Sequence, residues 1–313
     1  MREPSLVERG IAAGFSLGWR AGRVMDTQPA RAMFDAAAAL GHRRGGPGVA
    51  QLRANLRRVV GPDLSESELD TLTRRGLRSY ARYFREMFWM PTARPAVVAG
   101  RTRLYGVANV EAPRAQGRGI ICALPHSGNW DAAAVAYLSE FGPPLAVVAE
   151  RLRPESLYQR FQAYRESLGM EVLPLTGGDR PSAHLLATTL RAGGTICLPC
   201  ERDLSSSGVP VTFFGQLITV PPGPALLAVR TGAALIPTYA GFEGNGWCIR
   251  FFPEVAVNGP DAPKRLRDKV TKAMQQVVDQ FAVSISQAPE DWHMMQRLWH
   301  EDPATQPAEP SLQ

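Results

Sequence analysis

The segment ALPHSGNWDAAA, residues 123–134, places a histidine and an aspartate five positions apart, directly after an apolar run. A histidine beside a carboxylate is the usual arrangement for removing a proton from a hydroxyl group, because the carboxylate fixes the imidazole tautomer and stabilises the imidazolium. Acyl transfer to an alcohol uses this chemistry. The small residues between His126 and Asp131 would let the backbone turn tightly and let a substrate approach. The alternative is a surface loop that happens to hold one histidine.

Polar residues also follow two other apolar runs. Glu150 comes after LAVVA, and Glu201 and Arg202 come after GTICLPC. The carboxyl ends of parallel strands gather the ligand-binding and catalytic groups of an open sheet. If the strands before His126 and Glu201 are adjacent, both Glu201 and Asp131 can reach the imidazole. The pattern alone does not choose between these two carboxylates.

The elements that must position these residues change in character near residue 100. Residues 1–100 are predicted to form an arginine-rich helical layer, residues 101–300 an α/β body and residues 301–313 a tail, all within one domain. The body alternates apolar runs with segments of helix length, and runs that are apolar on both faces are typical of parallel strands. We therefore predict an α/β fold with a mostly parallel central sheet flanked by helices and an N-terminal helical layer.

Two helix signals stand out in the first hundred residues. Ser65 precedes Glu68 by three positions, which is a capping box at the start of a long amphipathic helix. GFSLG, residues 14–18, matches the G-x-S-x-G pattern of a hydrolase nucleophile, which needs a strand before the serine. Phe15 and Trp19 fall at helical spacing, so Ser16 is expected inside a helix.

The charge of the chain indicates an anionic partner. The net charge is +6, and arginines crowd the first hundred residues, as expected for contact with nucleic acid or a phospholipid surface. Near the start, Phe15 and Trp19 lie beside Arg9, Arg20 and Arg23, so this segment either docks on an anionic membrane or packs on the body. A basic binding module for nucleic acid or membrane is the alternative of another class, but it leaves the polar strand ends unexplained.

The sequence has no pattern of a membrane-spanning segment, a secretory signal, a disulfide framework or a zinc site. The longest early apolar stretch, GIAAGFSLGW, is shorter than the roughly 20 residues that cross a bilayer, and no secretory cleavage site follows it. We expect a cytoplasmic protein. Four cysteines in 313 residues do not form a disulfide framework, and CLPC lacks the second cysteine pair of a zinc site. No metal site is predicted.

The motif PHSGNWD resembles the His-x4-Asp motif of the glycerolipid-type acyltransferases. The similarity is greatest to the branch that contains lipid A late acyltransferases and actinobacterial phosphatidylinositol mannoside acyltransferases. It continues in the same order through ERDLSSSGVPVTFFG, PPGPALLAVRTGAALIP and DWHMMQRLW, and covers roughly residues 10 to 300. Together these motifs are far more specific than any one of them.

The resemblance implies a reaction in which His126 takes a proton from a mannose hydroxyl of a phosphatidylinositol mannoside. The hydroxyl then attacks the thioester of a long-chain acyl-CoA such as palmitoyl-CoA, with no covalent acyl-enzyme and no cofactor. In that branch Glu201 is the partner of the histidine, and Asp131 lies close by in a supporting role. The enzyme would be a monomer, peripheral on the cytoplasmic face of the cell membrane and independent of nucleic acid.

The resemblance also implies a set of substrate-binding residues. Glu150, Arg165 and His293 match positions that line the sugar pocket in the family. Arg202 is a further candidate, although ERD replaces the glycine and phosphate-binding arginine of the wider branch, so a glycerol-phosphate role does not carry over to it. This departure favours a sugar acceptor. The alternative within the same chemistry is a lipid A precursor or lysophospholipid, with acyl carrier protein as a possible donor.

Overall fold

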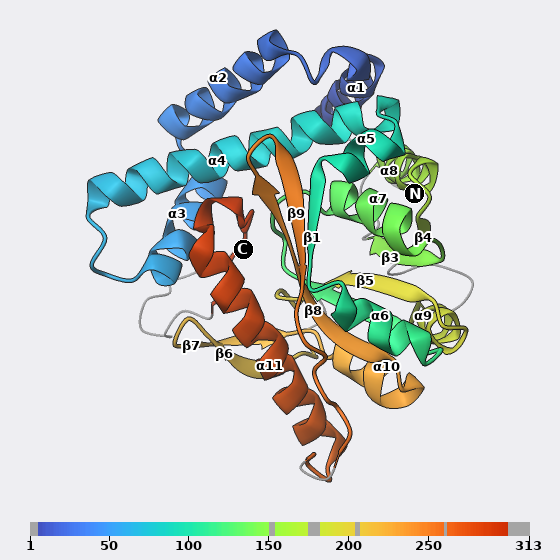
Figure 1. Ribbon diagram of the computed structural model, residues 1–313. Coiled ribbons are helices and arrows are strands. Elements are labelled where there is room, and N and C mark those ends of the chain that lie inside the picture. The colour runs from blue at the N-terminus through green and yellow to red at the C-terminus, as the bar shows by residue number, and fades with distance from the viewer. Residues whose placement is uncertain (1–5, 150–153, 175–181, 204–206, 260–261, 300–313) are drawn as a thin grey trace, which may run out of the picture.

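The computed structural model describes residues 6–149, 154–174, 182–203, 207–259 and 262–299. A seven-stranded sheet lies at its centre, with helices on both faces and the first helices across one end (Figure 1). The strands are β1 (Thr102–Tyr105), β2 (Ile120–Leu124), β3 (Leu145–Ala149), β4 (Glu171–Pro174), β5 (Thr195–Pro199), β6 (Val209–Phe213), β7 (Gln216–Val220), β8 (Ala234–Glu243) and β9 (Gly246–Phe251).

The helices include a set before residue 101 and a set within the sheet region. The α-helices are α1 (Leu6–Arg20), α2 (Gln28–Arg44), α3 (Pro47–Val60), α4 (Glu66–Trp89), α5 (Pro95–Gly100), α6 (Ala108–Ala115), α7 (Trp130–Phe141), α8 (Glu155–Ser167), α9 (Ser182–Arg191), α10 (Gly223–Thr231) and α11 (Leu266–Gln287). The 3-10 helices are η1 (Gly22–Val24), η2 (Met90–Thr92) and η3 (Pro289–Asp291). The predicted α/β fold with an N-terminal helical layer is confirmed.

The central sheet is mostly parallel, in the order β1-β9-β8-β2-β5-β3-β4. Strands β8, β2, β5, β3 and β4 run in one direction, whereas β9 is antiparallel to β8 and β1 is parallel to β9. The reversal at β9 follows from the short turn between Glu243 and Gly246, because a hairpin turn joins antiparallel strands. In β2 all five residues are buried, as the apolar run predicted.

Strand β6 departs from the expected pattern, because it pairs with β7 in a separate hairpin. Its residues alternate between buried and exposed, which suits a sheet with one solvated face rather than a doubly covered parallel strand. The turn consists of Phe214, with a φ of 48°, and Gly215, with a φ of 75°, and positive φ at both central residues is the geometry that joins tightly twisted strands.

Two apolar cores lie on the two faces of the sheet. Successive residues of β2 point to opposite faces, so Ile121 and Ala123 pack with α9, α10 and α11, whereas Ile120 and Cys122 pack with α6 and α7. In α11 the apolar stripe of Val270, Met274, Val277 and Phe281 is buried, but Leu266, which falls at the same helical spacing, is 47% exposed. Leu266 is the first residue of the helix, beyond the part that covers the sheet.

The N-terminal helices pack on the body through α4. Its predicted capping box is present, with the Ser65 side chain accepting from Glu68 N–H and the Glu68 carboxylate accepting from Ser65 N–H. Phe15 contacts aromatic rings of α4 and α8. Ser16 lies inside α1 and donates to the Ala12 carbonyl, as predicted. None of the helices in the described part of the chain is long and apolar enough to cross a membrane.

Candidate active site

His126 and Glu201 meet at the carboxyl edge of the sheet. Strands β2 and β5 are adjacent and pair Leu124 with Pro199, so each of the two residues lies two positions beyond the last paired residue of its strand. One oxygen of Glu201, Oε1, lies 2.9 Å from His126 Nδ1 and accepts the main-chain N–H of His126 at 2.6 Å. Glu201 is fully buried, whereas 38% of the His126 side chain is exposed. This geometry chooses Glu201 as the contact of the imidazole.

The charges of this pair favour a defined proton arrangement. Burial raises the pKa of Glu201, but the imidazole and its hydrogen bonds outweigh burial and hold that pKa below its usual value. Burial likewise lowers the pKa of His126, and the Glu201 carboxylate outweighs it and raises that pKa. Because ionised Glu201 only accepts hydrogen bonds, Nδ1 carries the proton and Nε2 is left as the basic nitrogen.

The turn that begins at His126, residues 126–130 and called the reactive loop below, is fixed by three of its residues, Ser127, Gly128 and Asn129. Ser127 is fully buried and donates to the Ala240 carbonyl of β8 at 2.8 Å. Gly128 has a φ of 56°, and a Cβ there would lie 2.6 Å from the Ala240 carbonyl oxygen. Asn129 caps α7 by accepting from the Ala132 N–H, and its side-chain amide donates to Glu86 at 2.9 Å. The loop is therefore held on the β8 side and on the α4 side.

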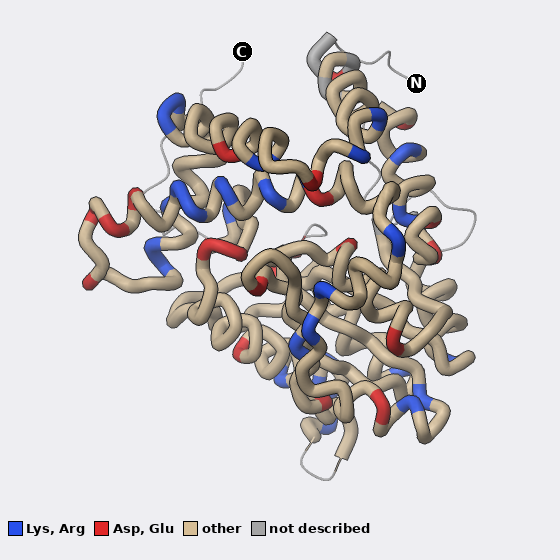
Figure 2. Tube along the Cα trace, turned by 45° about the horizontal axis from the view of Figure 1, so that its top comes forward, with Lys and Arg blue, Asp and Glu red and all other residues tan. Residues whose placement is uncertain are grey.

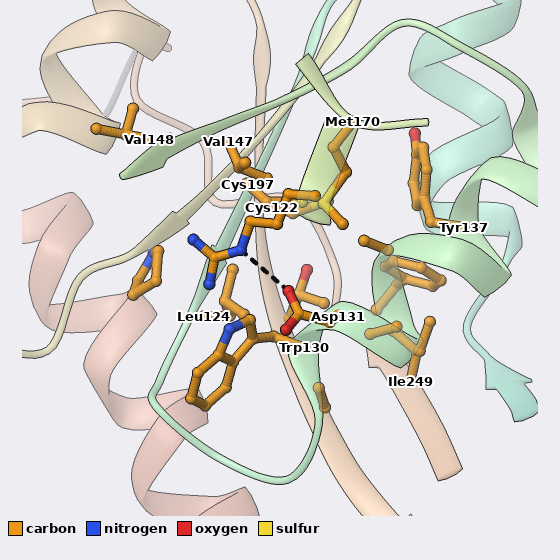
Figure 3. A pocket seen from close by; sticks show the side chains of 17 residues that line it. Cys122, Leu124, Trp130, Asp131, Tyr137, Val147, Val148, Met170, Cys197 and Ile249 are labelled. Carbon is orange, nitrogen blue, oxygen red and sulfur yellow. Dashed lines mark hydrogen bonds and ion pairs between the residues drawn. The ribbon is translucent and has the colours of Figure 1, made fainter. Parts of the chain in front are cut away.

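Asp131 lies on the first turn of α7 and forms an ion pair with Arg165 rather than a contact with His126 (Figure 3). Its carboxylate is 1% exposed, accepts from Arg165 Nε at 3.1 Å and from the Tyr164 hydroxyl at 3.2 Å, and lies 3.4 Å from the Tyr83 hydroxyl. Burial raises the pKa of both tyrosines, so they stay protonated and can donate. The structure thus brings together Asp131 and Arg165, two residues to which sequence similarity assigned different roles.

A small apolar cavity of about 80 Å³ lies beside this ion pair (Figure 3). It lies between α7 and the sheet, and Leu124, Tyr137 and Met170 are among the side chains around it. Cys122 and Cys197 also line it and face each other in register on β2 and β5. The four cysteines are free thiols, and the described residues contain no cluster of three or more potential metal ligands.

A larger groove of about 600 Å³ is lined by His126 itself. Its walls are mostly apolar side chains of α9, α10 and the end of β5, including Leu186, Leu198 and Leu227. Arg202, one of the predicted substrate-binding residues, lies close enough to His126 for its charge to oppose protonation of the imidazole. Arg230, which sequence reasoning missed, lines the groove from α10. Neither guanidinium forms an ion pair with another described residue.

His293 lies behind the reactive loop. It is 6% exposed, and its main-chain N–H donates to the His126 carbonyl at 2.8 Å. Its ring Nε2 lies 3.0 Å from the Ser79 hydroxyl of α4. Burial, with a smaller effect of His126, lowers the pKa of His293 to about 3, so this imidazole stays neutral. The remaining candidate, Glu150, lies outside the described residues.

Glu86 is a buried residue of the site that the sequence analysis did not single out. Its carboxylate accepts from Asn129, from the Trp247 indole at 2.7 Å and from Arg82 at 2.7 Å. The signal was present, because Glu86 continues the α4 stripe of Leu72, Gly76 and Tyr83 at helical spacing. A carboxylate on a buried stripe needs partners, and here one of them is the cap of α7.

An imidazole–carboxylate pair at the edge of an α/β sheet, open to an apolar groove, suits an enzyme that transfers an acyl group to a hydroxyl. The chain belongs to the bacterial lipid A biosynthesis acyltransferase family, whose model matches residues 8–301. It is 46% identical over 289 residues to the phosphatidylinositol mannoside acyltransferase of Mycolicibacterium smegmatis, covering 92% of this chain and 91% of that protein. It is 44% identical over 290 residues to the protein of the same name from Mycobacterium tuberculosis, covering 92% and 88%.

Proposed function

We propose that this protein transfers a long-chain acyl group, such as palmitoyl, from acyl-CoA to a mannose hydroxyl of a phosphatidylinositol mannoside. The observation that carries the chemistry is the His126–Glu201 pair at the edge of the apolar groove. The acceptor is inferred from the names of the two mycobacterial relatives. A lipid A precursor or a lysophospholipid would use the same site.

In the proposed reaction His126 acts as a general base. Its Nε2 takes the proton of the acceptor hydroxyl while the hydroxyl oxygen attacks the thioester carbonyl. The tetrahedral intermediate collapses to an ester and expels the CoA thiolate, which takes the proton back from the imidazolium. Ionised Glu201 stabilises the imidazolium between these steps. Ser127 is buried and donates to Ala240, so its hydroxyl is not available as a nucleophile, and the proposed reaction forms no acyl-enzyme on it.

The groove beside His126 suits an acyl-CoA. Its apolar walls match a hydrocarbon chain, and its two arginines match the phosphates, because guanidinium groups form charge-assisted, bidentate hydrogen bonds with phosphate. We place the thioester at His126 and a phosphate near Arg202. We expect the acceptor sugar to approach from the side of Arg165, which matches a sugar-pocket position of the family, as do Glu150 and His293.

We further propose that the protein is peripheral on the anionic inner leaflet of the cell membrane. The first helices expose large apolar side chains, namely Leu17, Val24, Met33 and Leu40. Basic positions recur along the same helices (Figure 2), and each near an anionic surface contributes about 1 kcal/mol of attraction. Co-sedimentation should require anionic lipid and weaken with salt, and Leu17→Ser with Met33→Ser should reduce it.

Transfer of radiolabelled palmitate tests the proposed reaction. Purified protein is incubated with palmitoyl-CoA or palmitoyl acyl carrier protein, and with phosphatidylinositol mannoside, a lipid A precursor or a lysophospholipid. We expect transfer from the CoA ester to the mannoside and a loss of at least about a hundredfold in His126→Ala and Glu201→Ala. Transfer by His126→Ala at the wild-type rate would overturn the mechanism, and transfer only to another acceptor would overturn the substrate.

A further inference from the structure

We propose that Asp291 is a positioning residue that holds His126 in place and fixes the proton of His293 on Nε2. This inference rests on the proposed function, in which His126 is the base. Asp291 lies in η3, more than 160 residues along the chain from the reactive loop, and its side chain is hydrogen-bonded to Ser79 and Phe242 rather than to His126 or Glu201. It acts on the site indirectly, through main-chain hydrogen bonds to the reactive loop and through its hydrogen bond with Ser79.

The side chain of Asp291 joins two elements on either side of the loop. It is 6% exposed, its Oδ1 accepts from the Ser79 hydroxyl of α4 at 2.8 Å, and its Oδ2 accepts from the Phe242 N–H of β8 at 3.0 Å. Burial outweighs these hydrogen bonds and raises the pKa of Asp291 to about 6. A buried carboxylate is costly unless it is hydrogen-bonded, and the raised pKa shows that these two hydrogen bonds do not fully offset the cost of burial.

The main chain of the same segment pairs with the reactive loop. The Asp291 carbonyl accepts from the Gly128 N–H at 2.8 Å, and the His293 N–H donates to the His126 carbonyl at 2.8 Å. Ser127 and Trp292 form an antiparallel bridge between these two contacts. Residues 126–128 are therefore hydrogen-bonded to residues 291–293 on one side, and His126 is hydrogen-bonded to Glu201 on the other.

The donor and acceptor roles in the hydrogen bonds around Ser79 are fixed. Ser79 has one hydroxyl proton, and this proton goes to Asp291 Oδ1. The Ser79 oxygen therefore accepts from His293 Nε2 at 3.0 Å, which requires the proton of the neutral imidazole on Nε2. His293 Nδ1 is buried and has no partner among the described residues. The Asp291 carboxylate can only accept, and it thereby determines which atom donates in each of these hydrogen bonds.

Asp291→Asn should reverse the direction of the hydrogen bonds at Ser79 while keeping a side chain of nearly the same size. The amide oxygen can still accept from Phe242, but its N–H₂ would then donate to Ser79. Ser79 would donate to His293 Nε2, and the His293 proton would move to Nδ1. Glu290 supplies a matched control, because it is the neighbouring acid, pairs with Arg75 at 2.8 Å and forms no bond to the loop.

The test uses the full chain labelled with ¹⁵N-histidine, which contains only five histidines. Ring ¹⁵N shifts report tautomers and pKa values, with His126→Gln and His293→Gln to assign the signals. We expect His293 to be protonated on Nε2 in the wild type and in Glu290→Gln, and on Nδ1 in Asp291→Asn. Asp291→Ala should leave Ser79 and Phe242 without their acceptor and lower the His126 pKa, because the loop loosens against Glu201.

Kinetics complete the test. A displaced base costs rate rather than affinity, so kcat should fall at least about tenfold in Asp291→Ala while KM for the acyl donor changes less than about twofold. If Asp291→Ala does not fold, the His293 tautomer in Asp291→Asn carries the test. A His293 proton that stays on Nε2 in Asp291→Asn, or wild-type kcat in a folded Asp291→Ala, would overturn the inference. The NMR result stands even if the substrates are wrong, so failure of the proposed function is distinguishable.

Discussion

A single oxygen of Glu201, Oε1, accepts hydrogen bonds from both the main-chain N–H and the ring Nδ1 of His126. The carboxylate therefore sets the position of the loop and the tautomer of the base at once. Because Glu201 is fully buried and carries its charge beside the imidazole, it also raises the pKa of His126. Loss of this one side chain should change geometry, proton placement and pH dependence together.

The pH dependence of transfer should follow His126. The base must be unprotonated, so the rate should fall as the pH drops through the raised pKa of His126. Glu201→Gln removes the charge that raises this pKa. We therefore expect its acid limb to move to lower pH, while the plateau of kcat falls by about 10²-fold to 10⁴-fold. A pH–rate profile with the remote Glu254→Gln as control checks this, and an acid limb that does not move would contradict it.

Gly128 should be intolerant of a side chain. An alanine there would adopt a positive φ and bring its Cβ within 2.6 Å of both the Ala240 carbonyl oxygen and the Gly241 Cα. We expect Gly128→Ala to lower the free energy of unfolding by about 3 kcal/mol and to abolish most activity. Gly142→Ala is the control, because its φ is 73° but no atom lies within 4 Å of the added Cβ, so it should cost about 1 kcal/mol. Urea unfolding would compare them, and equal losses would argue against the clash.

Asp131 should matter for stability more than for the protonation of His126. Removing one partner of a buried ion pair leaves the other charge uncompensated, so Asp131→Ala should lower the free energy of unfolding by about 3 kcal/mol or more. In Asp131→Ala with Arg165→Met the two losses should be less than additive. A double-mutant cycle by urea unfolding measures this, and the acid limb of kcat should stay near its wild-type position. If the acid limb of Asp131→Ala shifted as in Glu201→Gln, Asp131 would be a carboxylate that raises the pKa of His126.

The strands that position the site could be predicted from the residue pattern, but the partner of His126 could not, and only similarity to the family assigned Glu201 to it. The apolar run of β2 and the polar residues after β2 and β5 indicate one edge of a sheet. The choice between Asp131 and Glu201 depends on two further facts: β2 and β5 are adjacent, and Asn129 starts α7 so that Asp131 is carried towards α8. Neither fact is a local property of the sequence.

The contacts behind the loop were beyond sequence reasoning for a related reason. Ser79 and Asp291 are 212 residues apart, and no periodicity joins them. The DWH segment could be identified by its similarity to the family, but its pairing with the loop is tertiary. Glu86 differs, because a carboxylate on the apolar stripe of a helix is a local signal for a buried polar contact. Its partners, Asn129 and Trp247, still required the fold.

The two groove arginines should bind the acyl donor rather than act in the chemical step. Arg202→Gln and Arg230→Gln should each raise KM for palmitoyl-CoA by about 3-fold to 10-fold and leave kcat near the wild-type value, because a phosphate contact at a partly exposed site contributes about 1 kcal/mol. Arg191→Gln is the matched control, since this exposed arginine ends α9 but does not line the groove. Steady-state kinetics at low and high salt would measure this, because screening should shrink the difference between wild type and variant. An unchanged KM in both groove variants would move the donor phosphates out of this groove.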